Sequence, residues 1–302
     1  MRIVSLLGSA TEIVHALGLG DHLVGISHEC DYPPAALHLP RVSRPRFDPE
    51  GLTSGELDAA VRRAMQEHGS VYEVDSELLA SLRPDIVLTQ AVCEVCAVPT
   101  GSAEEAVASL PGSVRVVSLD AHDIAGILDT IKQVALAADA PHRGDELRSS
   151  LRARLDAVRE RTTAAAAPRV LLLEWLDPPF APGHWVPEMV ALAGGENLIG
   201  NPGVPSVQVE WSTLETLDPE VLLVEPCGFD LDQATADADR AASTLRRIAP
   251  RPLARGTGWV LHSAWFSRSG PRIVEGVEAL ARILHPDRFL DPPDARIARR
   301  WP

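Results

Sequence analysis

One stretch of the chain, residues 141–163, carries no strand pattern and separates two halves that both alternate short apolar runs with helical segments. Within it, apolar residues recur at helical spacing among many Arg, Asp and Glu residues; they are Leu147, Leu151, Leu155 and Val158. This spacing predicts one long exposed helix, about 35 Å long at roughly 1.5 Å per residue. We therefore expect two folding units joined by a single helix.

Both halves have the pattern of α/β units. Runs rich in Val, Ile and Leu lie at residues 3–7, 23–26, 85–89 and 114–118 in the first half, and at residues 169–175, 221–224 and 258–261 in the second. Helical patterns lie between these runs, and Ser9 and Glu12 have the spacing of a capping box at the start of the first helix. Such alternation is typical of parallel strands with crossover helices, so we expect two Rossmann-like lobes.

The length of the chain agrees with this division. A chain of 302 residues exceeds what one hydrophobic core usually organises. The predicted boundaries are an N-terminal lobe over residues 1–140, a bridging helix over 141–166, a C-terminal lobe over 167–285 and a loose tail, rich in Pro and Arg, over 286–302.

The charge balance argues against a nucleic-acid partner. The chain has 42 acidic and 28 basic residues and a net charge of −14, and the sequence shows no basic stripe. No apolar run approaches the roughly 20 residues that span a bilayer, and the apolar start passes directly into a helical pattern, unlike a signal peptide. We therefore expect a cytoplasmic protein without membrane insertion, whose four cysteines stay reduced.

The residues that follow the predicted strands are rich in thiols, imidazoles and indoles. Ligands of open parallel sheets bind outside the carboxyl ends of the strands, so two facing lobes would gather these loops around one cleft. The loops contain Cys30, Cys93, Cys96, Cys227, His28, His184, His262, Trp175, Trp185 and Trp265. We expect these side chains to converge on a single pocket.

Two pairs of these residues have the spacing of metal ligands. Cys93 and Cys96 form a Cys-x-x-Cys pair, and His28 and Cys30 form a His-x-Cys pair. Thiolates with an imidazole suit zinc or an iron–sulfur centre, and Cys227 is a further candidate ligand. A redox dithiol, or thiols that merely pack as small apolar groups, are the alternatives.

Aromatic side chains gather in the same loops, although they make up 4% of the chain. The set comprises Trp175, Phe180, Trp185, Trp265 and Phe266. Ring faces at the mouth of a cleft would hold a flat, largely apolar ligand, and burial in the core is the alternative. His184 and His262 are candidates to face a metal, or are simply hydrogen-bonded.

Several motifs in a fixed order resemble the cobalamin-binding solute receptors of ABC importers. They lie at residues 4–12, 24–27, 31–34, 82–87, 177–180, 194–197 and 265–272. The resemblance covers about residues 2–284 and implies the class III fold, in which one rigid helix bridges two α/β lobes. It also implies that a metal chelate, typically a corrinoid, haem or siderophore, binds between the lobes, with Arg268 and Arg272 at the ligand's edges.

The chain departs from the family pattern in its docking residues, its cysteines and an extra segment. Glu77 fits the acidic residue through which the first lobe of such receptors contacts a transporter. At the corresponding place in the second lobe stands Ser212, and Glu215 is displaced by nearly a turn. The cysteine loops and the segment at about residues 49–69 are foreign to the pattern. We therefore expect a corrinoid-binding protein, and the docking residues do not predict that it docks on an ABC permease.

Two other functions stay open from the sequence. A cytosolic metalloenzyme, or an iron–sulfur or zinc protein, would use His28, Cys30, Cys93 and Cys96 as metal ligands and leave one position open for a substrate. An importer receptor would require an export signal before the present start.

Overall fold

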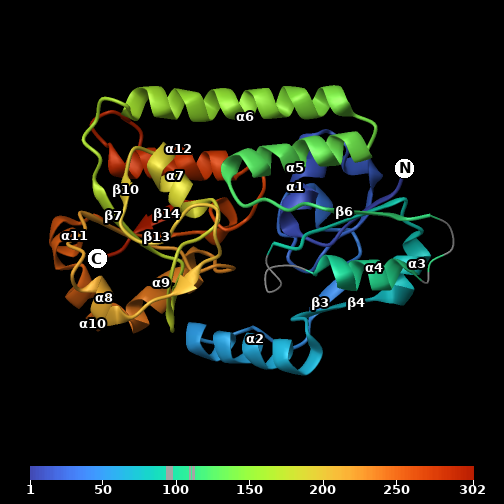
Figure 1. The fold of residues 1–302 in the computed structure, drawn as a ribbon, viewed down its shortest axis with the longest axis horizontal. Coiled ribbons are helices and arrows are strands. Elements are labelled where there is room, and N and C mark those ends of the chain that lie inside the picture. Colours follow the sequence, from blue (N-terminus) through green and yellow to red (C-terminus); the bar gives the residue numbers. More distant parts are fainter. Residues whose placement is uncertain (93–97, 109, 111–112) are drawn as a thin grey trace.

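The computed structural model describes residues 1–92, 98–108, 110 and 113–302. Two α/β lobes lie side by side beneath α6 (Pro141–Thr162), which runs along both of them (Figure 1). The predicted fold class, two lobes with parallel sheets and one long bridging helix, is confirmed.

The N-terminal lobe is built on a parallel sheet in the spatial order β2-β1-β5-β6. Its strands are β1 (Ile3–Ser5), β2 (Leu23–Gly25), β5 (Ile86–Thr89) and β6 (Arg115–Ser118). Neighbouring residues of a strand face opposite sides, so Ile3 packs toward α1 (Gly8–Ala16) and α5 (Ile124–Ala137), whereas Val4 packs toward α3 (Ser76–Leu82) and α4 (Thr100–Ala108).

The C-terminal lobe repeats this arrangement in the spatial order β10-β7-β12-β13-β14. Its strands are β7 (Arg169–Leu173), β10 (Glu196–Asn197), β12 (Val221–Val224), β13 (Gly258–Leu261) and β14 (Ala298–Arg300). One face packs on α7 (Val186–Leu192) and α12 (Ile273–Leu284), and the other on α9 (Leu231–Arg240) and α10 (Ala242–Ile248). Smaller elements are β8 (Trp175–Leu176), β9 (Pro179–Ala181), β11 (Val207–Gln208), α8 (Trp211–Leu214) and α11 (Pro250–Arg255).

The bridging helix belongs to a core that both lobes share. Leu151, Leu155 and Val158 of α6 are buried in one apolar cluster with residues of α5 and α12. Arg154 of α6 also forms a bidentate ion pair with Glu278 of α12, at 2.8 and 2.9 Å. In the described part of the chain, none of the helices combines the length and apolar character needed to cross a bilayer.

The segment after α12 is not the loose tail that its composition predicts. Residues 298–300 form β14, which pairs antiparallel with β13. Trp301 is 2% exposed, and its indole Nε1 donates to Asp239 Oδ1 at 2.8 Å. The prediction was wrong because one edge of β13 would be unpaired without this segment. The Pro- and Arg-rich segment supplies a short strand that pairs with that edge and a tryptophan that packs beside it.

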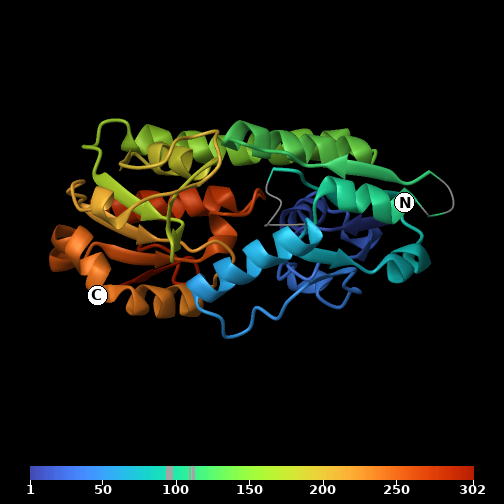
Figure 2. The same ribbon diagram turned by 60° about the horizontal axis from the view of Figure 1, so that its bottom comes forward.

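The extra segment forms a helix at the tip of a hairpin. β3 (Ser43–Pro45) and β4 (Tyr72–Val74) pair antiparallel in the N-terminal lobe, and α2 (Ser54–His68) lies between them in sequence. A capping box of Thr53 and Glu56 starts α2, and Gly69, in the left-handed conformation, ends it. α2 lies on the side of the molecule opposite α6 and extends from the N-terminal lobe toward the other lobe (Figures 1 and 2).

Candidate ligand-binding site between the lobes

The loops at the carboxyl ends of the two sheets meet between the lobes. Arg272 Nη2, beyond β13, contacts Glu12 Oε1 of α1 at 2.5 Å, and Arg268 forms an ion pair with Asp31, beyond β2. Ser9 and Ser269 approach within 3.4 Å. We call Glu12, Asp31, Arg268 and Arg272 the seam cluster. It shows that two of the predicted ligand residues, Arg268 and Arg272, lie where the lobes face each other.

The seam cluster balances two carboxylates with two guanidinium groups. Burial raises the pKa of Glu12, although its hydrogen bond from Arg272 opposes this shift. Burial also acts against ionisation of Asp31, but the charge of Arg268 outweighs it and the pKa of Asp31 is lowered. The Arg272 guanidinium lies between the rings of Tyr32 and Trp265, at 4.6 and 4.7 Å. Both arginines are therefore already engaged.

The predicted capping box in α1 is wrong. The N-cap is Leu7, which makes no side-chain cap, and Glu12 points to Arg272 instead of to the start of its own helix. The guanidinium of Arg272 is charged, so it offers the buried Glu12 carboxylate a stronger hydrogen-bond partner than the neutral backbone N–H at the helix start does.

The loops after β7 and β12 form a second group, Glu174, Glu225 and Cys227, which we call the acidic wall. Glu174 Oε2 accepts from Gly183 N at 3.0 Å and from Ser206 Oγ at 2.7 Å. Glu225 is fully buried; its Oε1 accepts from Ser267 Oγ at 2.5 Å, and its Oε2 has no hydrogen-bond partner among the described residues.

Burial dominates the chemistry of the acidic wall. It raises the pKa of Glu174 to about 7, partly offset by the hydrogen bonds from Ser206 and Gly183. Burial, reinforced by the charge of Glu174, raises the pKa of Glu225 well above its usual range. Burial and the two carboxyls also raise the pKa of Cys227. At neutral pH the wall therefore contains a protonated carboxyl, Glu225, which is fully buried, and a protonated thiol, Cys227, which is partly exposed and is a hydrogen-bond donor.

The loop after β2 faces this wall from the other lobe. His28 Nδ1 lies 2.9 Å from Ser43 Oγ, and His28 Nε2 lies 3.3 Å from Glu29 Oε1. Burial acts against ionisation of Glu29, but the hydrogen bond and charge of His28, with the charge of Arg268, lower its pKa overall. The charge of Glu29 in turn contributes to the raised pKa of Cys227, so the two loops are within electrostatic range across the seam.

The predicted metal cluster is not assembled in the described part of the chain. Cys30 is buried, its Sγ lies 3.0 Å from Thr11 Oγ1, and burial raises its pKa. Burial likewise raises the pKa of Cys227, and Cys30 and Cys227 are free thiols. Cys93 and Cys96 lie outside the described residues. Among those that are described, no group of three or more His, Cys, Asp or Glu residues is arranged to hold a metal ion.

Two of the aromatic residues predicted to contact the ligand, Trp185 and Phe266, are buried in the core. Phe266 has no exposed surface, and Trp185 is buried with its Nε1 donating to Phe266 O at 2.5 Å. Both belong to the core cluster that contains α7 and α12. Trp265 lies at the seam against Arg272, and its Nε1 donates to Glu275 Oε2 at 2.9 Å.

The other predicted contacts are spread along the C-terminal lobe. Trp175 and Phe180 pair across the β8–β9 hairpin, directly beyond Glu174. His184 lies near the seam, 6.0 Å between ring centroids from His122 of the N-terminal lobe, and burial lowers its pKa. His262 Nδ1 accepts from Ala264 N at 3.2 Å.

Glu12 and Asp31 were not predicted as site residues. Their partners lie more than 230 positions away, Arg268 being separated from Asp31 by 237 residues and Arg272 from Glu12 by 260. The available signal is Glu12 as the one charged residue in the stretch 3–14, and it does not identify the arginine that compensates this charge.

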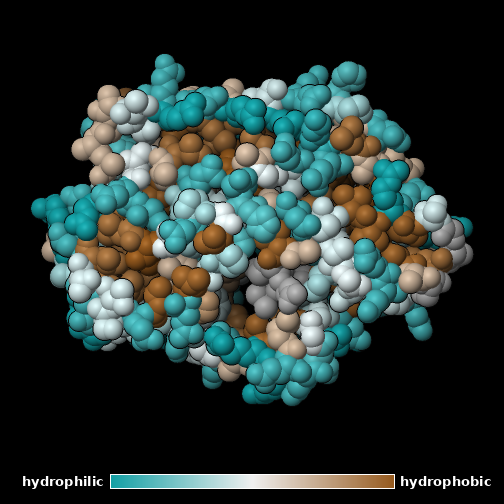
Figure 3. Space-filling model, in the orientation of Figure 1, coloured by the Kyte–Doolittle hydropathy of each residue, from teal (hydrophilic) through white to brown (hydrophobic). Residues whose placement is uncertain are grey.

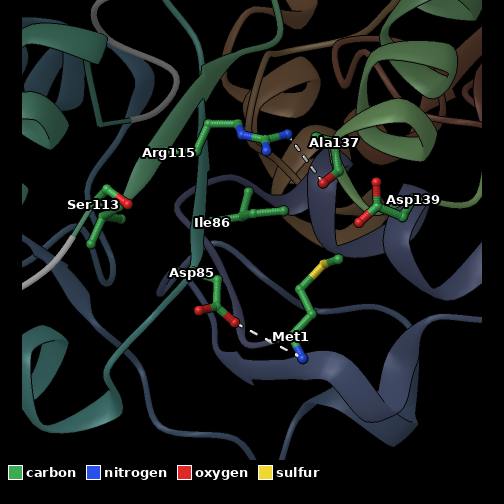
Figure 4. Close-up of a pocket in the computed structure, with 8 residues that line it drawn as sticks. Met1, Asp85, Ile86, Ser113, Arg115, Ala137 and Asp139 are labelled. Carbon is green, nitrogen blue, oxygen red and sulfur yellow. Dashed lines mark hydrogen bonds and ion pairs between the residues drawn. The ribbon is translucent and has the colours of Figure 1, made fainter.

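The surface has hollows of different character. A small opening lies between the lobes on the face shown in Figure 3. A cavity of about 430 Å³ lies at the amino ends of the N-terminal strands and is lined by Met1, Asp85, Ile86, Arg115 and Asp139, among others (Figure 4). Since it is at the opposite end of the sheet from the seam, it is not part of the site.

A sequence model of the periplasmic binding protein family matches residues 3–249. The chain belongs to this family. The vitamin B12-binding protein of Vibrio cholerae is 25% identical over 287 residues, which are 94% of this chain and 88% of that protein. The vitamin B12-binding protein of Yersinia pestis is 25% identical over 93% of this chain and 85% of its own length.

Solved structures of periplasmic binding proteins share the fold. The V. cholerae vitamin B12-binding protein superposes with a TM-score of 0.69 at 23% identity, covering 95% of this chain and 98% of that one. A periplasmic haem-binding protein of Roseiflexus sp. RS-1 superposes with a TM-score of 0.70 at 23% identity, covering 95% and 99%. The predicted membership of the solute-receptor family is thereby confirmed.

Proposed function

We propose that this periplasmic binding protein family member binds a metal chelate between its lobes, and that the chelate is a corrinoid. The curated relatives that match nearly the whole chain are named for vitamin B12, which supports a corrinoid. Haem-binding structures share the fold, so haem is the natural competitor.

The charge pattern of the seam favours a corrinoid over haem. A corrinoid presents amide groups at its edge, whereas haem presents carboxylates. Arg268 and Arg272 are already paired with Asp31 and Glu12, so they offer no unpaired cation to a ligand carboxylate. Within the acidic wall, the protonated thiol of Cys227 can donate to an amide oxygen, and any carboxylate placed there would meet Glu174.

The test is a titration of purified protein with dicyanocobinamide, hydroxocobalamin and hemin, followed by visible absorbance and by the thermal unfolding midpoint. We expect a saturable spectral change and stabilisation with a corrinoid, and at least about tenfold weaker binding of hemin. Tighter binding of hemin would contradict the corrinoid assignment, and the absence of any response to all three would contradict chelate binding.

We further propose that the protein acts in the cytoplasm and does not dock on an importer. The free thiols Cys30 and Cys227 support a reducing compartment. Glu77 is exposed in the first turn of α3, as docking requires, but Glu215 is held by Arg247 at 2.7 Å. Fractionation of native cells tests both points, since recovery of the protein outside the cytoplasm would contradict them.

A further inference from the structure

The two halves of α2 pack on different lobes. Leu57, in its first half, packs against the apolar cluster that fills the C-terminal lobe. Val61 and Met65, in its second half, pack against the second apolar cluster of the N-terminal lobe. α2 therefore connects the lobes on the side opposite α6, as Figure 2 shows for the light-blue helix.

The first turn of α2 makes specific polar contacts with the C-terminal lobe. Ser54 Oγ donates to Asp237 Oδ1 of α9 at 2.8 Å. Gly55 lies so close to Asp177 that a Cβ atom at this position would overlap the Asp177 carboxylate. α2 also contacts β8, the strand directly beyond Glu174 of the acidic wall.

One end of α2 is fixed and the other end is merely docked. The chain enters and leaves the α2 segment through β3 and β4, and Arg46 N donates to Val71 O at 3.0 Å at the base of the hairpin. Contact with the C-terminal lobe is non-covalent. The first turn can therefore leave that lobe while the base of the hairpin stays in place.

The docked contact is incompletely satisfied. Asp237 is 2% exposed, and its Oδ2 has no hydrogen-bond partner in the described part of the chain. Arg240 of α9 donates to the other oxygen of Asp237, Oδ1, at 3.0 Å, so the polar contacts of this carboxylate are all made through Oδ1. A buried carboxylate oxygen without a partner weakens docking, because undocking returns it to water.

The lobes themselves have little freedom to separate. α6 packs on α5 and α12, the seam cluster ties Arg268 and Arg272 to the N-terminal lobe, and Glu188 of α7 accepts from Ile124 N of α5 at 2.9 Å. Hinge opening would break all of these contacts together, whereas undocking of α2 breaks its first-turn contacts alone.

We infer that α2 is a gating strap: its first turn undocks from the C-terminal lobe to admit and release the ligand, and docks again to close the site beside the acidic wall. This inference rests on the proposed function for the identity of the ligand, a metal chelate. Undocking of α2 is itself a property of the protein without ligand. It predicts that weakening the docked end speeds both entry and exit of the chelate.

The experiment compares Leu57→Asp with Ala59→Asp. Leu57→Asp places a charge against the acidic C-terminal lobe, and Ala59→Asp adds the same charge at an exposed position of the same helix. Stopped-flow absorbance with dicyanocobinamide should show association and dissociation rates raised by about tenfold or more in Leu57→Asp and unchanged in Ala59→Asp. Ser54→Ala, which removes the bond to Asp237 without adding charge, should change both rates in the same direction.

Amide hydrogen exchange of the ligand-free protein provides the second readout. We expect residues 54–60 to exchange faster than α6, and faster still in Leu57→Asp, while the rest of the protein is unaffected. The gating inference would be contradicted if the amides of α2 exchanged solely through global unfolding of the protein. It would also be contradicted if dicyanocobinamide bound and dissociated at equal rates in Leu57→Asp and Ala59→Asp. If no chelate binds, the proposed function fails, and the exchange data still decide whether α2 undocks.

Discussion

Glu174 couples the stability of the protein to pH. Its pKa is about 7 in the folded protein, against an ordinary value of 4.5, because burial disfavours the carboxylate. The folded state therefore holds this proton more tightly than the unfolded state does. The stabilisation is complete below about pH 4.5 and is lost as the pH rises through about 7.

We predict that Glu174→Gln removes this loss. From pH 5 to pH 8, the free energy of unfolding of the variant should rise relative to that of the unsubstituted protein by about 2 kcal/mol. Urea unfolding of both proteins at the two pH values measures the difference. Glu146→Gln, at an exposed position of α6, is the control for added glutamine, and equal pH slopes for Glu174→Gln and the unsubstituted protein would contradict the prediction.

Single residues show how far the sequence could predict the site. The positions of His28, Cys227, Trp265 and Arg268 near the seam follow from strand ends, because parallel strands bring their carboxyl ends to one edge. The pairing of Glu12 with Arg272 does not follow, because it depends on how closely two separate lobes approach. The sequence places Phe266 in a loop after a strand, and that position is compatible both with burial in the core and with exposure at the mouth of a cleft.

The last strand, β14, shows the same limit for whole elements. The central strands β1, β2, β5, β6, β7, β12 and β13 were predicted within one or two residues because apolar runs mark them, but residues 298–300 are Ala-Arg-Arg and lack that pattern. The extra segment was located at about residues 49–69 and its helix lies at Ser54–His68, but the contact of this helix with both lobes depends on tertiary structure. Edge strands and insertions are defined by their neighbours and not by their own sequence.

We predict that Trp301→Ala destabilises the protein by about 3 kcal/mol, because it removes a buried indole that covers the edge beyond β13. Leu290→Ala is the matched control in the same terminal segment, since Leu290 is 96% exposed, and it should have little effect. Urea unfolding of both variants distinguishes them. Equal stabilities would mean that the segment is a tail after all.

The whole molecule is held together on two sides and at its seam. α6 joins the lobes covalently and packs on both, the seam cluster ties them in the middle, and α2 docks across the opposite side. The two lobes and the bridging helix were predictable because the helical spacing of apolar residues and the alternation of strand and helix patterns indicate them directly. The tightness of the seam was not, because it arises from charged pairs that are remote in sequence.

Hydrogen-exchange mass spectrometry with and without dicyanocobinamide would locate the ligand on the molecule. We expect protection of the loops at residues 27–31, 174–183, 225–229 and 262–268, which converge on the seam from both lobes. Protection confined to the outer cavity around Asp85 and Arg115, or no change in the four loops at a saturating ligand concentration, would contradict binding between the lobes.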